Sequence, residues 1–496
     1  MDNSANNPET PNRAMIHTRR TFLRTSVTAG AALFAEVLGA RDPGQARSSA
    51  PPPPSEPPRQ TEDVIFLTPE DSRYGAAREL YNAGVHLQPQ RIAMCATEAG
   101  VQQALQRAKA ENWPVAVKSG GHSFEGFSLN EDGLVINVSP FCDLRLDARS
   151  GLLTAGAGCR LRDVNRFLLP QGRFLPAGSC ATVGLAGLTL GGGYGMFARK
   201  WGLTCDHLRA LRMVDGTGAI RDSAAEPDLL WAGRGGGNGH FGIVTQLTLQ
   251  TRGVPRAFSS WKFRAYHLDE TRAASLLEAW FDATAALPND AFSAWIMNGS
   301  QVTILLTTVG ASGQQGVTAF RHKLTGLTNK ATSAPPVPLM KSLPWYYGEP
   351  GPVSFKNTSA GYYQGMADIR AALPGIFYEV LTAPGLVFQI NTLGGAITDG
   401  ADGAYPHRAW PYLGEAQAYW NGALHAAELR AAIGRIRDHI AQAGITRHYA
   451  NYPDLSFQDW PTAYYGRENY QRLQVLKKRY DPDDRVRHPQ SVRLPA

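Results

Sequence analysis

The chain has 496 residues, of which 43% are hydrophobic, and its formal net charge is +7 at pH 7. This length allows a large buried core and predicts two domains. The charge is modest, and the sequence lacks a Lys/Arg-rich block or a basic stripe interleaved with aromatic residues, so nucleic-acid binding is disfavoured. The five cysteines have neither CxxC nor zinc-site spacing, which disfavours a disulfide scaffold and a zinc site.

The first 46 residues have the pattern of an export signal. Residues 18–24 carry the twin arginine Arg19-Arg20, and a weakly apolar segment at 25–38 follows that is too short to span a bilayer. We therefore predict a twin-arginine signal peptide at 1–46, export by that machinery to the periplasm or the cell exterior, and no stable membrane anchor. A disordered basic tail is the alternative. The Pro-rich residues 47–62 predict a stiff linker.

The remaining chain predicts alternating helices and strands. Residues 99–112 and 161–169 have helical spacing, whereas 114–118, 134–138 and 242–249 have the composition of strands. This alternation predicts an α+β domain at 63–252. From residue 253 onward the sequence predicts helices at 271–287, 315–327 and 425–444, with strands at 293–309 and 387–393. These elements predict a second, α/β domain at 253–444, followed by a C-terminal segment at 445–496.

Three glycine-rich segments, at 118–123, 176–206 and 235–242, are confined to the first domain. Glycine lets a backbone approach a bulky ligand closely and exposes N–H groups to anionic oxygens. The first segment contains His122 and the second contains Cys180. On their own, His122 is more simply explained as a satisfied loop histidine and Cys180 as a small buried hydrophobic residue.

The motifs in combination resemble one flavoprotein family. They are Lys118-Ser119-Gly120-Gly121-His122 with Gly126, Gly178-Ser179-Cys180-Ala181-Thr182-Val183-Gly184, the run at 191–195 with Arg199, Gly202 and Asp206, residues 231–245, and Tyr449-Ala450-Asn451-Tyr452-Pro453-Asp454. From about residue 63 to the C-terminus the chain resembles the berberine-bridge-enzyme-like branch of the vanillyl-alcohol-oxidase/PCMH family, which also contains secreted oligosaccharide oxidases. Lys118 replaces the usual Arg of this family, and Lys cannot offer Arg's bidentate contact to a phosphate.

This resemblance implies a PCMH-type FAD-binding domain, a substrate domain whose antiparallel sheet forms the ceiling of the flavin site, and a C-terminal segment that returns to the FAD domain. It also implies bicovalent FAD, with His122 bonded to the flavin 8α carbon and Cys180 to C6. Both side chains are good nucleophiles toward an electron-poor ring. The implied cofactor-binding residues are His122, Cys180, Lys118, Ser119, Gly120, Gly121, Ser123, Gly178, Ser179, Val183, Gly184, Gly191, Gly192, Gly193, Gly195, Gly242, Ile243, Val244, Asn451 and Tyr452.

The resemblance also assigns roles at the substrate side. Tyr449 is the implied catalytic base, and a phenol can serve as one only if a cation or hydrogen-bond donors stabilise its anion; the alternative is a packed tyrosine. Gln389, Asn391 and Thr398 are the implied substrate-binding residues. In plant relatives a Val at the position of Val183 goes with an open oxygen pocket, although simple packing explains a valine equally well.

We therefore predict an exported, FAD-linked oxidase that acts on a CH–OH group and passes electrons to O2, forming H2O2. The predicted substrate is a small molecule or an oligosaccharide. In the favoured case it is a sugar or oligosaccharide whose anomeric hydroxyl is oxidised, which gives a lactone. One alternative is a same-fold oxidase of a secondary-metabolite alcohol or phenolic group. The other is a non-catalytic, exported protein that binds flavin or carbohydrate.

Overall fold

The computed structural model describes residues 62–349 and 351–496. The predicted signal peptide lies outside these residues, as does the predicted linker up to residue 61. Within the described part of the chain, no helix combines the length and apolar character needed to cross a membrane.

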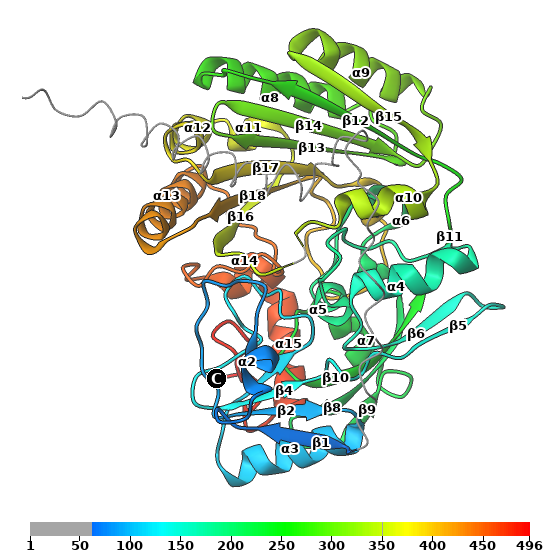
Figure 1. Cartoon of the computed structure of the whole chain (residues 1–496), viewed down its shortest axis with the longest axis vertical. Coiled ribbons are helices and arrows are strands. Elements are labelled where there is room, and N and C mark those ends of the chain that lie inside the picture. The colour runs from blue at the N-terminus through cyan, green and yellow to red at the C-terminus, as the bar shows by residue number, and fades with distance from the viewer. Residues whose placement is uncertain (1–61, 350) are drawn as a thin grey trace, which may run out of the picture.

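The first domain contains two main sheets (Figure 1). The four-stranded sheet has the order β1-β2-β4-β3, in which β1 is antiparallel to β2 and the other pairs are parallel. The five-stranded sheet has the order β5-β6-β10-β8-β9 and is antiparallel. Their strands are β1 (Val64–Leu67), β2 (Arg91–Cys95), β3 (Val115–Lys118), β4 (Leu134–Asn137), β5 (Leu144–Asp147), β6 (Leu152–Gly156), β8 (Leu208–Asp215), β9 (Ile220–Asp222) and β10 (Gly242–Gln250).

Short helices and a two-stranded ribbon connect and cover these sheets. The helices are α2 (Tyr74–Arg78), α3 (Glu98–Ala110), α4 (Leu161–Leu168), η1 (Leu169–Gln171), α5 (Leu185–Leu190), α6 (Ala198–Trp201), η2 (Thr204–His207) and α7 (Pro227–Gly233); the ribbon pairs β7 (Arg173–Phe174) with β11 (Arg252–Gly253). Helix α3 shows why this sequence folds as predicted. Thr97 caps its N-terminus by accepting from the Gly100 N–H, and Val101, Ala104, Leu105 and Ala108 bury one face.

The second domain is built on a seven-stranded antiparallel sheet of order β15-β12-β14-β13-β17-β18-β16. Its strands are β12 (Phe258–Ala265), β13 (Ala291–Asn298), β14 (Gln301–Thr308), β15 (Lys330–Val337), β16 (Phe355–Tyr363), β17 (Leu386–Thr392) and β18 (Tyr412–Tyr419). Its helices are α8 (Glu270–Thr284), α9 (Gln315–Leu327), α10 (Leu339–Ser342), η3 (Leu343–Tyr346), α11 (Met366–Ile369), α12 (Leu373–Thr382), η4 (Gly395–Ile397) and α13 (Ala423–Gln442).

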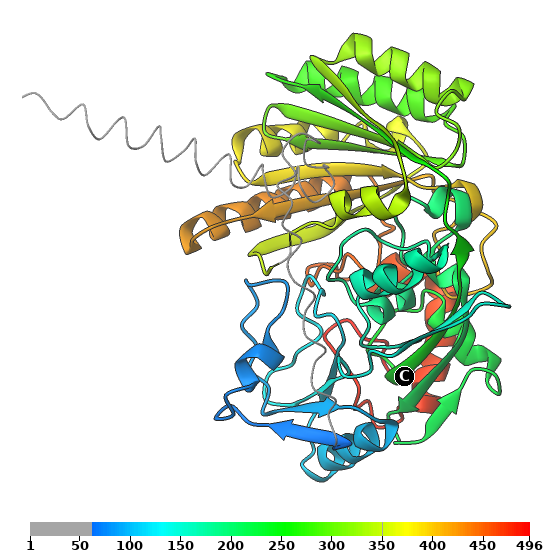
Figure 2. The same ribbon diagram turned by 45° about the vertical axis from the view of Figure 1, so that its right-hand side comes forward.

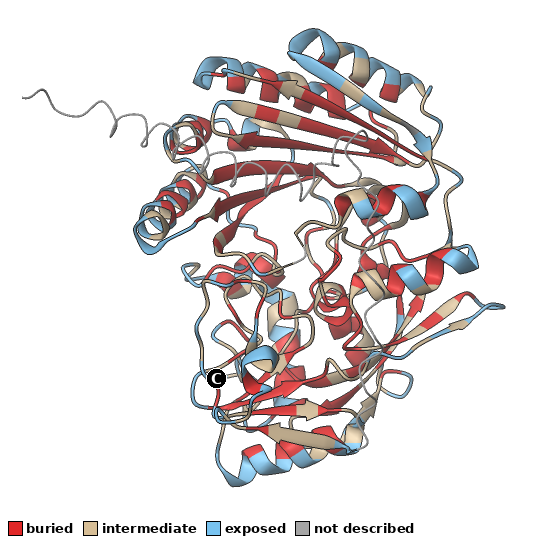
Figure 3. Ribbon diagram, viewed as in Figure 1, coloured by how far each residue is buried: buried red, intermediate tan, exposed pale blue. Residues whose placement is uncertain are grey.

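The longer helices of the second domain cover the face of this sheet that points away from the first domain (Figures 1 and 2). Apolar residues of α8, α9, α12 and α13 form one core with the strands, while the outward sides of the helices are exposed (Figure 3). The opposite face of the sheet therefore faces the first domain. The predicted α+β class and the antiparallel sheet are confirmed.

The C-terminal segment packs into the core of the first domain through α14 (Trp460–Tyr465) and α15 (Arg467–Tyr480). Lys477 anchors it: the ammonium is fully buried, lies 2.7 Å from Asp481 and 2.8 Å from Asp484, and donates to the carbonyl of His240. The bond to His240 joins α15 to the loop that leads into β10, and the two ion pairs hold the turn that follows α15.

We expect Lys477→Met to destabilise the protein by about 3–5 kcal/mol, because it leaves the carboxylate of Asp481 buried without its cation. Lys478→Met is the matched control: that side chain is exposed, and its loss should change stability by less than about 0.5 kcal/mol. Urea unfolding followed by fluorescence measures both. Equal unfolding midpoints for the two variants would contradict the assigned role of Lys477.

Candidate active site

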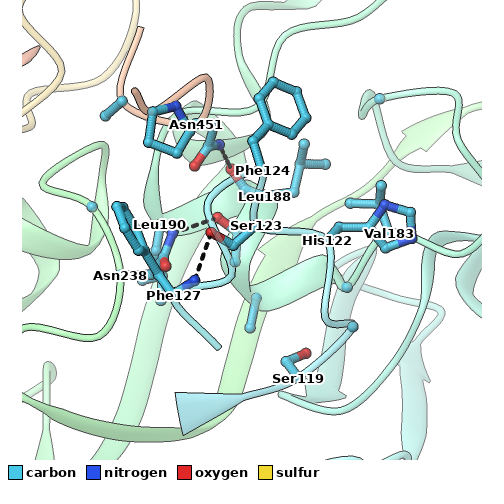
Figure 4. A pocket seen from close by; sticks show the side chains of 18 of the residues that line it. Ser119, His122, Ser123, Phe124, Phe127, Val183, Leu188, Leu190, Asn238 and Asn451 are labelled. Carbon is cyan, nitrogen blue, oxygen red and sulfur yellow. Dashed lines mark hydrogen bonds between the residues drawn. The ribbon is translucent and has the colours of Figure 1, made fainter. Parts of the chain in front are cut away.

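A cavity of about 360 Å³ lies between the glycine-rich loops of the first domain and the sheet of the second. Its lining runs from His122 and Cys180 to the loop at Asn238, Gly239 and His240. Figure 4 shows the first-domain side, where His122, Phe124 and Phe127 surround the space and Asn451 donates to the carbonyl of Leu188. The C-terminal segment thus reaches the cavity wall.

Two glycines bring the loops of His122 and Cys180 together. A Cβ at Gly120 would lie 2.3 Å from the backbone N of Gly184, and a Cβ at Gly184 would lie 2.6 Å from that of Gly120. Real side chains do not fit at such distances, so this backbone contact requires glycine on both sides. The contact places the loop after β3 against the loop before α5.

His122 and Cys180 meet at one hydroxyl. His122 Nε2 lies 2.9 Å from Thr182 Oγ1, and Cys180 Sγ lies 3.9 Å from the same oxygen. The ring of Tyr81 stacks on His122 with the centroids 4.1 Å apart. The two predicted nucleophiles therefore occupy one end of the cavity, held by residues from separate loops.

Burial sets the protonation of both groups. It lowers the pKa of His122 to about 3, and the nearby cation of Arg160 acts in the same direction, so the imidazole is neutral at physiological pH. Burial raises the pKa of the Cys180 thiol, while hydrogen bonds from Thr182 and Val183 oppose this shift. A neutral imidazole keeps the lone pair that a nucleophile needs.

The ceiling of the cavity is polar although it is deeply buried. Strands β16, β17 and β18 present five polar side chains to it: Asn357, Gln389, Asn391, Glu415 and Gln417. Among the residues that the structure describes, three of them have a buried amide oxygen without a hydrogen-bond partner: Asn357, Gln389 and Gln417. A buried acceptor without a partner destabilises the protein by about 1–3 kcal/mol. A ligand that donates hydrogen bonds to this wall would remove that penalty and is therefore favoured here.

A tyrosine cluster joins this ceiling to the first domain. The hydroxyls of Tyr194 and Tyr452 are hydrogen-bonded to each other, and Asn391 Nδ2 donates to Tyr194 at 3.3 Å. The Tyr449 hydroxyl accepts from the Gly193 N–H at 2.8 Å and from Asn451 at 3.1 Å. Burial nonetheless raises the pKa of Tyr449 to about 12.

Most of the predicted site residues line the cavity. They are Ser119, Gly120, Gly121, His122, Ser123, Gly178, Ser179, Cys180, Val183, Gly184, Gly195, Gly242, Val244, Gln389, Asn391, Tyr449, Asn451 and Tyr452. The structure brings these residues together, but it leaves the roles of Tyr449 and the other predicted residues as predictions.

Six predicted residues do not line the cavity: Lys118, Gly191, Gly192, Gly193, Ile243 and Thr398. Lys118 is buried at the end of β3, and Ile243 is buried within β10. The run from Gly191 to Gly193 instead supports the tyrosine cluster: a Cβ at Gly191 would lie 2.0 Å from Asn451 Oδ1. Thr398 is exposed after η4.

Four cavity residues were not predicted from the sequence: Tyr194, Asn357, Glu415 and Gln417. Glu415 and Gln417 are two residues apart on β18 and therefore point to the same face of the sheet. Two polar residues at this spacing inside an otherwise apolar segment were the sequence signal that could have predicted a polar strand face. Burial raises the pKa of Glu415 to about 8, while hydrogen bonds from Gln417, Tyr452 and Asn357 oppose the shift.

The residues of the cavity fit a flavin dinucleotide. One end offers two nucleophilic side chains, His122 and Cys180, that contact the same hydroxyl of Thr182. Glycines supply much of the remaining first-domain wall, and Gly121, Gly237 and Gly239 have positive φ angles of 70°, 89° and 71°, which expose backbone groups to a ligand.

Comparisons with known proteins define the class. The family model described as "FAD binding domain" matches residues 89–224, and the model "Berberine and berberine like" matches residues 448–493. The chain is an FAD-linked oxidoreductase.

The relatives and solved structures extend these matches. The chain is 29% identical over 450 residues to "Uncharacterized FAD-linked oxidoreductase YgaK" of Bacillus subtilis, covering 86% of this chain and 96% of that protein. It is 27% identical over 451 residues to the chitooligosaccharide oxidase of Gibberella zeae, covering 84% and 89%. The structure of BBE-like 1 from Physcomitrella patens superposes with a TM-score of 0.80 at 26% identity, covering 87% and 97%. The resemblance to the berberine-bridge-enzyme-like FAD-linked enzymes is confirmed.

Proposed function

We propose that this chain is an FAD-dependent oxidase that oxidises a hydroxyl of a sugar or oligosaccharide and passes the electrons to O2. The observation that carries the sugar assignment is the group of three unpartnered amide oxygens, from Asn357, Gln389 and Gln417, on one wall of the cavity. A polyhydroxylated ligand supplies several donors in one small volume and satisfies them together. An apolar metabolite would leave them unsatisfied.

We also propose that His122 and Cys180 hold the flavin covalently. This is supported by their meeting at Thr182 and by the neutral state of the His122 imidazole. When bound, FAD supplies a two-electron acceptor. The chain's own residues bind and orient the substrate against it: polar groups of β16–β18 on one side and the first-domain loops on the other.

Aromatic side chains add a second feature that suits a sugar. Phe124, Phe355 and Tyr419 also line the cavity, and Phe124 stacks on Tyr452 with the centroids 5.2 Å apart. Flat aromatic faces beside polar groups can hold a ring that has apolar faces and a hydroxylated rim. The similarity to a chitooligosaccharide oxidase supports the same substrate class.

The test is a panel of reducing mono- and oligosaccharides together with aromatic and aliphatic alcohols, scored by H2O2 release from the holoprotein. We expect release with reducing sugars and a lactone as the product. Release with an apolar alcohol alone would replace the sugar assignment by the secondary-metabolite alternative. Bound flavin without turnover of any compound would favour a non-catalytic binding protein.

We expect Gln389→Met to raise KM for the sugar about tenfold, because it removes one acceptor worth about 1–1.5 kcal/mol, and to change kcat less. Gln364→Met is the matched control, since that side chain is exposed and its amide donates to the carbonyl of Ala409. Steady-state kinetics measures both variants. An unchanged KM for Gln389→Met would argue against the amide wall as the sugar-binding surface.

Export remains part of the proposal and rests on the twin arginines alone. Because the twin-arginine route carries folded proteins, it suits a chain that acquires its cofactor before crossing a membrane.

A further inference from the structure

We propose that the groove between α12 and α13 is a second carbohydrate-binding site, which holds a neutral polysaccharide without reacting with it. This inference rests on the proposed function, because the polymer held there would carry the sugar ends that the active site oxidises. Binding at a second site raises the effective concentration of those ends around the enzyme.

The groove contains a cavity of about 420 Å³ that is separate from the active-site cavity. Tyr378 and Glu379 of α12 line it on one side, and His425, Glu428 and Arg435 of α13 line it on the other. The two helices pack against each other on the side of the second domain that points away from the first domain (Figure 1). The groove is therefore a surface feature of the second domain alone.

The groove and the active-site cavity lie on opposite faces of the seven-stranded sheet. On β18, Glu415 and Gln417 line the active-site cavity, whereas Ala416 and Ala418 pack in the core that α13 covers. Successive residues of a strand point to opposite faces, so the sheet separates the two sites. One sugar unit cannot contact both sites, and a ligand that uses both must be a long chain or the surface of a polymer.

An exposed aromatic ring forms part of the groove. Tyr378 is 58% exposed, and no other aromatic side chain in the part of the chain that the structure describes is exposed. Tyrosine combines a flat apolar face with a polar hydroxyl, which suits it to a binding surface that is in contact with water. A sugar ring also has apolar faces and a hydroxylated rim, so it can stack on this ring.

The polar groups beside Tyr378 offer both donors and acceptors. Glu379 accepts from Arg435 Nε at 2.6 Å and from Nη2 at 2.7 Å, which leaves Nη1 as a donor without a partner among the described residues. His425 Nε2 lies 2.8 Å from the carbonyl of Pro384 and donates to it, so Nδ1 of the neutral ring is an acceptor. Hydroxyls both donate and accept, and they match this mixture.

The charges of the groove select a neutral polymer. An acidic polymer would meet the carboxylates of Glu379 and Glu428, while the cation of Arg435 is already paired with Glu379. A metal ion is not the ligand here, because the described residues contain no group of three His, Cys, Asp or Glu side chains that could hold one. An apolar helix of a partner protein would bury the Glu428 carboxylate without a cation, which is costly.

The test is retention of the holoprotein on insoluble cellulose, chitin and xylan whose reducing ends have been converted to alditols. This treatment removes the sugar ends that the active site would bind. We expect retention on at least one polymer, and Tyr378→Ala should weaken binding to it about three- to tenfold, which is the size of one stacked ring contact. Glu428→Ala, on the other helix, should weaken it severalfold.

Two controls accompany these variants. Both variants should oxidise a soluble disaccharide as the wild type does, which shows that they are folded and that the groove is not part of the active site. Val475→Ala removes a 64% exposed apolar side chain from α15 in the first domain and should bind the polymer as the wild type does. If Val475→Ala loses as much binding as Tyr378→Ala, the retention is unspecific adsorption and the proposal fails.

The outcomes separate this proposal from the proposed function. A wild type that none of the three polymers retains, or equal retention of the wild type and Tyr378→Ala, would overturn the second site and leave sugar oxidation untouched. Retention that depends on Tyr378 in a protein that oxidises apolar alcohols but no sugar would support the second site and contradict the proposed function.

Discussion

Replacing Tyr452 by Phe is expected to lower kcat by about 10²–10⁴-fold, which is the usual contribution of general acid–base catalysis. The substitution keeps the aromatic ring that stacks on Phe124 and removes only the hydroxyl that contacts Tyr194 and reaches Glu415. The loss should therefore appear in kcat with little change in KM. Stopped-flow measurement of flavin reduction under anaerobic conditions isolates this step.

Tyr449→Phe is the informative comparison, because Tyr449 is the base that the family resemblance implies. Its hydroxyl already accepts two hydrogen bonds, from Gly193 and Asn451. We expect its loss to reduce the rate less than the loss of the Tyr452 hydroxyl does. If Tyr449→Phe abolishes flavin reduction while Tyr452→Phe is nearly normal, Tyr449 is the base, as the family resemblance implies.

Removing both proposed attachment points should release the flavin. His122→Ala and Cys180→Ala should each keep flavin on the denatured polypeptide through the remaining bond, whereas the double variant should lose it. The reason is that both side chains lie at one end of the cavity and contact Thr182, so either can hold the ring alone. Acid precipitation followed by the absorbance of pellet and supernatant measures this.

Cys142→Ala serves as the control, because that thiol is exposed and does not line the cavity. It should retain flavin as the wild type does. Release of the flavin by one of the two single variants would show a single attachment at the residue that was replaced.

The sequence predicted the first-domain part of the site much better than the ceiling. Glycine runs are visible because close backbone contacts, such as Gly120 against Gly184, tolerate no other residue. The long helices α8, α9 and α13 begin within two residues of their predicted starts, since their apolar spacing is regular.

Strands β16 and β18 were not predicted. The polar side chains that they contribute to the ceiling of the cavity were therefore not predicted either. Their sequences contain Gly, Ala, Asn and Glu, which have low strand propensity, and they lack the apolar alternation of an ordinary half-buried strand. These strands are held by pairing with β17 and with each other, which is a long-range effect. The polar residues that weakened the strand signal are the ones that face the cavity.

The most direct measurement is peptide mass spectrometry of the acid-denatured, protease-digested wild-type protein. A flavin attached at two points should join the peptide that contains His122 to the peptide that contains Cys180 in one species, with the yellow colour in that fraction. This is the result we predict. Unmodified peptides at both positions, with all flavin free in solution, would contradict the covalent assignment.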